Sequence, residues 1–168
     1  LVLHGEVEVA VSFSETSVDA AARVVVNYNA QTREYLSIGL GGYQRAFVVS
    51  KFLPGEGWQA LAVEGSWRKL EPAKDYQLKL VVKGQKVVLF VDRIRVIDHL
   101  LDGPVIGSQT GLFVWGQQTV KFRDFRSSVK QPVGFVVMEF SGSYDALYND
   151  VLVPVAENLN ISLHRADD

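Results

Sequence analysis

Apolar and polar residues alternate from the start of the chain. Every second residue from Val7 to Phe13 is apolar, and the alternate positions, which form the other face, are Glu6, Glu8, Ala10 and Ser12. A period of two predicts a β-strand with one buried face and one wet face.

Nine further segments rich in β-branched and aromatic residues follow, separated by turns such as Gly41-Gly42 and Pro54–Gly57. About ten short strands with such turns predict an antiparallel two-sheet sandwich or a barrel, and we expect a concanavalin-like jelly roll. No segment before residue 140 has a helical period. The nine segments are Arg23–Asn29, Tyr35–Leu40, Ala46–Leu53, Trp58–Val63, Tyr76–Val82, Lys86–Val91, Ile94–His99, Thr110–Val114 and Val120–Phe125.

One predicted hairpin turn departs from the usual turn chemistry. Asp92-Arg93 lies between two apolar strands, where a two-residue turn favours Asp-Gly because both central residues need a positive φ. Arg93 therefore predicts backbone strain or a different turn type.

The pattern changes after Pro132. Val133–Phe140 is a nearly continuous apolar run, typical of a strand that is covered on both faces. Ser141-Gly142-Ser143 then offers a loop and a helix N-cap, and apolar residues recur at helical spacing from Tyr144 to Leu159.

Pro154 lies inside this helical pattern and predicts a kink, and Ile161–His164 resumes as a strand. Strand, helix and strand form one βαβ unit. The charge changes at the same place: residues 130–168 hold 2 Lys+Arg against 6 Asp+Glu, whereas residues 1–129 hold 15 against 13. We therefore divide the chain into a sandwich, residues 1–129, and a truncated unit, residues 130–168.

A lone βαβ unit cannot cover both faces of a two-stranded parallel sheet. We expect the chain to be a piece of a longer protein, with the tail held by the sandwich or by a second copy in a homo-oligomer. The chain has no Cys, which excludes disulfides and thiolate metal sites and favours a cytoplasmic location. It has no basic stripe for nucleic acid and no apolar run long enough for a membrane.

The body resembles the concanavalin A-like lectin/glucanase sandwiches, including laminin-G-like and keto-disaccharide-hydrolase-type domains. The residues that carry this resemblance are Tyr35–Gly42 (YLSIGLGG), Val87–Val96 (VVLFVDRIRV) and Gly111–Gly116 (GLFVWG). The second stretch is similar to a V-x-V-D-G-x-x-V hairpin, with Arg93 in place of Gly. The resemblance implies a jelly-roll sandwich and leaves its ligand open.

The tail resembles the opening of predicted nucleotide-binding TIR-like domains of bacterial multidomain proteins. The matching stretches are Gly134–Ser141, Tyr144–Tyr148, Val153–Glu157 and His164–Asp168. The resemblance implies that the loop with Phe140, Ser141 and Ser143 faces a nucleotide such as NAD in the full-length protein. The family's catalytic glutamate would lie beyond Asp168, so this fragment itself is expected to be non-catalytic and to hold no cofactor.

Sugar sites on such sandwiches use aromatic platforms beside hydrogen-bonding side chains. Trp58 and Trp67 have loop-like neighbours, and Tyr43 with Arg45 follows Gly41-Gly42, so these four residues are our candidate ligand-binding residues, while Trp115 is expected in the core. No paired-carboxylate motif of a glycosidase is present, and the His and Asp residues match no metal motif. We therefore expect a sensing or scaffolding module with a carbohydrate or small-molecule ligand. A sugar-active hydrolase of the keto-disaccharide-hydrolase type and a structural oligomerisation spacer are the alternatives.

Overall fold

The computed structural model describes residues 5–103, 105–129, 133–139, 141–158 and 161–166. They belong to two compact units, a sandwich that ends at Val129 and a C-terminal unit that begins at residue 130. Each unit has its own architecture.

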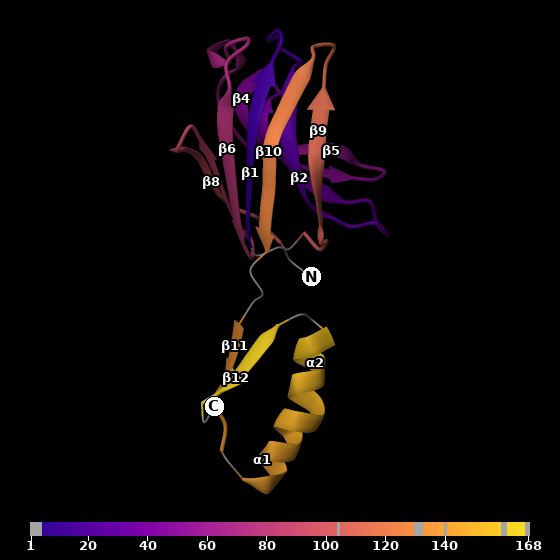
Figure 1. The fold of residues 1–168 in the computed structure, drawn as a ribbon. Coiled ribbons are helices and arrows are strands. Elements are labelled where there is room, and N and C mark those ends of the chain that lie inside the picture. The colour runs from indigo at the N-terminus through magenta and orange to yellow at the C-terminus, as the bar shows by residue number, and fades with distance from the viewer. Residues whose placement is uncertain (1–4, 104, 130–132, 140, 159–160, 167–168) are drawn as a thin grey trace. The chain divides into compact units, whose positions relative to one another are not determined.

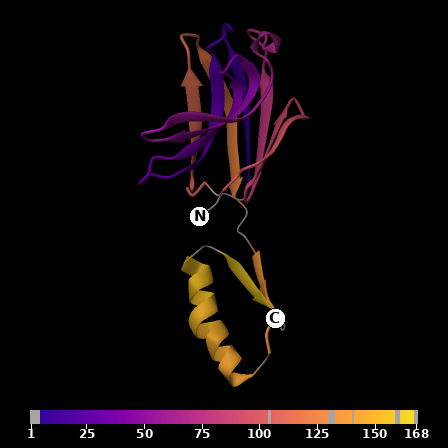
Figure 2. The ribbon, with the colours of Figure 1, turned by 180° about the vertical axis from the view of Figure 1, so that it is seen from behind.

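The sandwich consists of two five-stranded antiparallel sheets (Figures 1 and 2). The first sheet has the order β10-β1-β6-β7-β8, and the second has the order β5-β4-β3-β2-β9. The strands predicted from the sequence are all present, so the mainly β sandwich is confirmed. Their bounds are β1 Gly5–Phe13, β2 Ala21–Tyr28, β3 Tyr35–Gly41, β4 Arg45–Leu53, β5 Gly57–Ser66, β6 Tyr76–Lys83, β7 Lys86–Val91, β8 Ile94–Leu100, β9 Gln109–Trp115 and β10 Val120–Val129, with a 3₁₀ turn η1 at Trp67–Lys69.

Strand β1 shows how the alternating pattern builds the core. The alternating residues Val7, Val9, Val11 and Phe13 are at most 2% exposed and lie in the core between the sheets. On the other face, the carboxylates of Glu6 and Glu8 contact Lys79 Nζ at 2.7 and 3.2 Å. The wet-face prediction for these glutamates is confirmed.

The Asp92-Arg93 turn has the strained form. Asp92 has φ 51° and Arg93 has φ 68°, and the flanking residues Val91 and Ile94 are paired across the hairpin. Two positive φ values in a two-residue hairpin define a type I′ turn. The Asp92 carboxylate accepts a hydrogen bond from the Gln77 backbone N–H at 2.9 Å, which ties the turn to β6.

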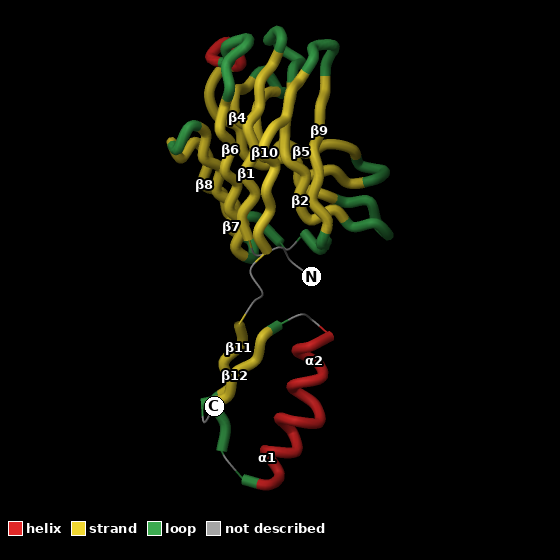
Figure 3. The backbone as a smooth tube through the Cα atoms, viewed as in Figure 1, coloured by secondary structure: helices red, strands yellow, loops and turns green. Residues whose placement is uncertain are grey.

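The C-terminal unit is a βαβ unit. Strand β11 (Val133–Val136) pairs in parallel with β12 (Ser162–Arg165), and helical turns connect them. These are α1 (Gly142–Leu147), a π-helical segment η2 (Tyr148–Leu152) and α2 (Val153–Asn158). In Figure 3 the described part of the chain is helical in this unit and at the η1 turn.

The predicted kink at Pro154 takes the form of a π turn. The Val153 backbone N–H bonds to the Tyr148 carbonyl, five residues earlier. Proline has no N–H and its ring clashes with the carbonyl four residues before it, so a regular α-helix cannot continue through this point. The wider turn lets the helix pass the proline.

The prediction that the first tail strand is long and covered on both faces is wrong. Strand β11 ends at Val136, residues 137–139 are not in a strand, and residue 140 lies outside the described residues. Val133, Phe135 and Val137 are 66–78% exposed. In a unit of two strands and one helix, the helix can cover only one of the two faces of the sheet with apolar side chains.

No helix among the described residues is long and apolar enough to cross a membrane.

The Asp92-Arg93 turn yields a stability prediction. Replacing Arg93 with Gly removes the Cβ that disfavours a positive φ, so Arg93→Gly is expected to raise the free energy of unfolding by about 0.5–1 kcal/mol. Urea denaturation with an unchanged slope measures the gain.

The control variant for this prediction is Arg93→Ala, which removes the same charge but keeps a Cβ. An equal gain in both variants would show that the charge, and not the backbone, is responsible, and a loss in Arg93→Gly would contradict the strain.

Candidate functional site

The candidate site lies on the face of the second sheet that points away from the core. Ala22 and Val24 of β2 enter the core, so alternation places Arg23 on the opposite, outer face. The register sets Arg23 beside Gly39 of β3 and Phe113 of β9. A glycine neighbour leaves room for a long side chain to lie over the sheet.

This outer face is concave. Trp58 is on β5 and Phe113 is on β9, and these strands form the two edges of the sheet. Four strand spacings separate the edges by about 19 Å in a flat sheet. The ring centroids nevertheless lie 5.2 Å apart, so the sheet curves and brings its edges together over the middle strands.

The Arg23 guanidinium is held at the bottom of this hollow. Its Nε and Nη2 both donate to the Gly41 carbonyl, and the Nε···O distance is 3.0 Å. Its Nη1 donates to Ser50 Oγ at 3.0 Å, and that hydroxyl donates to the Ser37 carbonyl at 3.2 Å. The side chain is therefore fixed by three strands of the same sheet.

Tyr43 covers the guanidinium from the turn between β3 and β4. The Arg45 N–H bonds to the Gly42 carbonyl at 2.9 Å, and Tyr43 and Gln44 between them have φ 52° and 60°. The turn is therefore type I′, although neither Tyr nor Gln favours the positive φ that both central positions of such a turn need. It places the Tyr43 ring centroid 5.5 Å from Arg23 Cζ.

Gly42 is required by the position of Arg23. A Cβ on Gly42 would lie 1.9 Å from Arg23 Nη2, and the residue has φ +91°. The glycine motif before this turn lies between two strands, β3 and β4. It makes space for the guanidinium.

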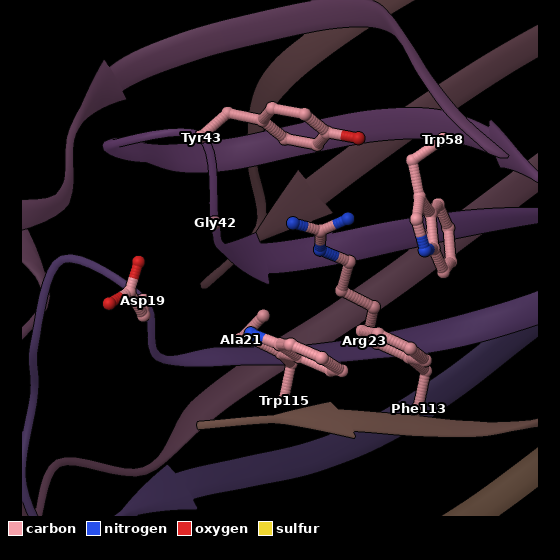
Figure 4. Close-up of a pocket in the computed structure, with 8 residues that line it drawn as sticks. All are labelled: Asp19, Ala21, Arg23, Gly42, Tyr43, Trp58, Phe113 and Trp115. Atoms are coloured by element: carbon pink, nitrogen blue, oxygen red, sulfur yellow. The ribbon is translucent and has the colours of Figure 1, made fainter. Parts of the chain in front are cut away.

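The result is a pocket of about 270 Å³ with aromatic walls (Figure 4). In Figure 4 the guanidinium lies between the Tyr43 ring and the rings of Phe113 and Trp115, with Trp58 on one side and Asp19 on the opposite side. The pocket is lined by Asp19, Ala21, Arg23, Gly42, Tyr43, Trp58, Phe113 and Trp115.

Arg23 carries a buried charge without an ionic partner. It is 3% exposed, and none of the ion pairs in the described part of the chain includes it. Burial lowers the pKa of Arg23 to about 10, which leaves the group protonated at neutral pH. A guanidinium has five N–H donors, and the contacts above use three of them. One N–H on each terminal nitrogen remains.

The structure divides the four ligand-binding candidates into two pairs. Tyr43 and Trp58 line the pocket and are 43% and 37% exposed. Arg45 and Trp67 are not among its lining residues. Trp67 is half-buried in η1, with Arg68 Cζ 5.8 Å from its ring.

The prediction that Trp115 lies in the core is wrong. It is 64% exposed. Trp115 is the last residue of the edge strand β9 and pairs with Ala21, which places it on the outer face beside Arg23. The sequence around Trp115 is apolar on both faces of the strand, with Phe113 on the outer face and Val114 on the other, and this concealed the alternation.

Sequence reasoning missed Arg23, Phe113 and Asp19. A signal for Arg23 was present, because it is the one charged residue in the otherwise apolar run Ala21–Val26. Phe113 had no such signal, since its role depends on the curvature of the sheet.

In the C-terminal unit, Ser141 is the N-cap residue of α1, but its side chain makes no capping hydrogen bond. Ser143 lies in the first turn of α1, and Phe140 lies outside the described residues. Asp145 of that turn binds Arg165 Nη1 at 2.6 Å, which links the helix to β12. Among the described residues, no group of three or more His, Asp or Glu side chains is placed to hold a metal ion.

No protein-family model matches the chain, and no curated protein matches its sequence. Solved structures share the architecture of the sandwich. The carbohydrate-binding module CBM66 from Bacillus subtilis superposes with a TM-score of 0.65 at 18% identity, covering 74% of this chain and 74% of that one.

Galectin LEC-6 from Caenorhabditis elegans superposes with a TM-score of 0.54 at 19% identity, covering 76% of this chain and 84% of that one. A mutant of the GH43 protein BlXynB from Bacillus licheniformis gives 0.51 at 17% identity, covering 75% of this chain but 27% of that one. These likenesses establish the fold of the sandwich, two packed antiparallel β-sheets, which this chain shares with those structures.

Proposed function

We propose that the sandwich is a carbohydrate-binding module whose site is the pocket around Arg23. The observation that carries the proposal is a buried guanidinium with unused N–H donors inside a concave aromatic wall. Aromatic rings pack against the C–H faces of a sugar, and a few fixed polar groups orient its oxygens. The likeness to a carbohydrate-binding module and to galectins supports this reading.

The size of the pocket suits one sugar ring. Its volume of about 270 Å³ is near the lower end of the range for ligand pockets, which begins at about 300 Å³. The Trp58 side chain forms one edge of the aromatic wall and is 37% exposed. Its indole N–H can donate a hydrogen bond to a sugar oxygen.

Binding without catalysis is the function that the pocket supports. Glycoside hydrolysis by the common route needs two carboxylic acids on opposite sides of the bond. Of the described residues that line the pocket, Asp19 alone carries a carboxylate.

A second hollow, of about 920 Å³, adjoins the pocket. Asp19 and Trp115 line both, and the second hollow adds hydroxyl and amide side chains such as Ser14, Gln117 and Thr119. Trp115 therefore lies where a longer glycan would cross from one hollow to the other.

We propose a further role for the C-terminal unit: that it is the first βαβ unit of a TIR-like nucleotide-binding domain. The parallel pairing of β11 with β12 supports this role. So does the position of Ser141 and Ser143, which follow the carboxyl end of β11, where open α/β sheets bind ligands. The sandwich would then serve as the sensing module of a longer protein that binds or consumes a nucleotide such as NAD.

The first prediction concerns the aromatic wall. A glycan array probed with the whole chain is expected to identify sugar ligands, and Trp58→Ala is expected to raise the Kd of a hit by about tenfold or more, a loss of about 1.4 kcal/mol. Titration calorimetry measures the change.

Trp67→Ala is the matched control for this prediction, because it removes the same side chain outside the pocket, and its Kd is expected to stay within about twofold. Thermal unfolding of both variants confirms that they are folded. Equal losses in both, or an array without a hit, would contradict the pocket as a sugar site.

The second prediction concerns ligand length. A trisaccharide of the ligand found on the array is expected to bind more tightly than its monosaccharide, since it reaches the second hollow. Trp115→Ala should remove most of that advantage while the monosaccharide Kd changes by less than about threefold. A variant that loses both ligands equally would show that Trp115 belongs to the first sugar position only.

The third prediction concerns the tail. The exposed apolar face of β11 would be covered by additional strands or helices in a complete TIR-like domain. Sequencing the gene beyond the codon for Asp168 is expected to reveal further alternating strands and helices and a glutamate on one of them. A stop codon directly after Asp168 would refute the TIR-like proposal and would leave the sugar proposal untouched.

A further inference from the structure

The unpaired charge of Arg23 indicates which class of sugar the pocket binds. Buried cations in proteins are usually paired with an anion, because a desolvated charge is costly. Arg23 is 3% exposed and is bound to neutral acceptors, the Gly41 carbonyl and the Ser50 hydroxyl. The described part of the chain supplies no carboxylate to its guanidinium within ion-pair distance.

The unused donors of Arg23 match a carboxylate. After its three contacts with Gly41 and Ser50, one N–H remains on each terminal nitrogen. A carboxylate has two oxygens that can accept from two guanidinium nitrogens together, and such paired bonds are shorter and stronger than neutral ones. A sugar hydroxyl would use only one of the donors well.

The walls of the pocket strengthen this attraction. The rings of Tyr43 and Phe113 lie 5.5 and 5.8 Å from Arg23 Cζ. They keep water from both faces of the guanidinium, and a charge pair gains strength when water is excluded. The rings themselves carry no net charge, so the cation stays uncompensated until an anion enters.

Asp19 restricts where a negative charge can lie. It is exposed in the turn before β2 and lines the pocket on the side opposite Trp58 (Figure 4). Its carboxylate accepts hydrogen bonds from hydroxyls and repels a second anionic group. The pocket therefore fits a ligand with one acid group at the Arg23 end and hydroxyls at the Asp19 end.

We propose that the pocket recognises an acidic sugar, a monosaccharide unit whose carboxylate is bound by Arg23 and whose hydroxyls face Asp19. This inference rests on the proposed carbohydrate-binding function and names the class of sugar. A phosphate group shares the attraction to a guanidinium, and a sugar phosphate among the probes distinguishes it from a carboxylate.

The experiment compares sugars that differ in one group. Titration calorimetry with the whole chain uses D-glucuronate, D-galacturonate, their neutral parents D-glucose and D-galactose, and D-glucose 6-phosphate. The uronates are expected to bind at least about tenfold more tightly than the neutral parents, because their carboxylate makes charge-assisted hydrogen bonds with the guanidinium. The phosphate ester, with up to two negative charges, is expected to bind more weakly than the uronates because of Asp19.

Two variants separate the charge from the fold. Arg23→Met is expected to abolish the preference for uronates over neutral sugars. Asp19→Asn, an exposed turn position whose substitution leaves the sheet intact, is expected to raise the ratio of uronate to neutral-sugar affinity roughly three- to tenfold, because it removes the repulsion of the acid group while the hydrogen bonds to the hydroxyls weaken equally for both kinds of sugar. The second variant keeps the test valid if Arg23→Met does not fold.

Equal affinity for uronates and neutral sugars, with both lost in Trp58→Ala, would overturn the acidic-sugar inference and leave the carbohydrate site standing. Tightest binding of the phosphate ester would also overturn it. Binding of none of the five probes, together with an empty glycan array, would overturn both proposals. An Asp19→Asn variant in which the ratio of uronate to neutral-sugar affinity is unchanged or lower would contradict the assigned orientation and with it the inference.

Discussion

The fork of hydrogen bonds from Arg23 to the Gly41 carbonyl is the interaction on which the outer face of the second sheet depends. These bonds hold the guanidinium in the hollow of the outer face, where a side chain on Gly42 would collide with Nη2. The turn that follows then holds Tyr43 at φ 52°, and its ring covers the guanidinium. Trp58 and Phe113 complete the cover from the two sheet edges.

We expect this arrangement to lower the free energy of unfolding of the sandwich and not to raise it. An apolar residue in place of a buried charge is often neutral or stabilising, and a bulky residue at positive φ costs of order 1–3 kcal/mol. The core between the sheets is already filled by the alternating residues of strands such as β1. The proposed sugar ligand would account for a charge held at such a cost on the outer face of the sheet, and the aromatic walls of the pocket support that proposal.

Much of the fold could be predicted from the sequence because strands carry their own period. The alternation at Val7–Phe13 and the turns at Gly41-Gly42 and Asp92-Arg93 place strands and hairpins without knowledge of the tertiary structure. The residues that line the pocket were harder to predict from the sequence than the strands were. Tyr43 and Trp58 follow glycines, which made them candidates from the sequence, and both line the pocket. Phe113 and Trp115 lie instead in a run that is apolar on both faces. Which face of β9 lines a pocket depends on curvature and on the edge position, and neither is local.

Sugar binding in the pocket around Arg23 can be followed through the indole N–H signals of the three tryptophans in a ¹H–¹⁵N correlation spectrum. The sugar under test is titrated into the ¹⁵N-labelled chain. Trp58 and Trp115 line the pocket and Trp67 does not. We therefore expect the signals of Trp58 and Trp115 to shift together along one binding curve, while the Trp67 signal stays in place. Movement of the Trp67 signal alone, or three unmoved signals at a concentration of sugar that calorimetry shows to be saturating, would contradict sugar binding in this pocket.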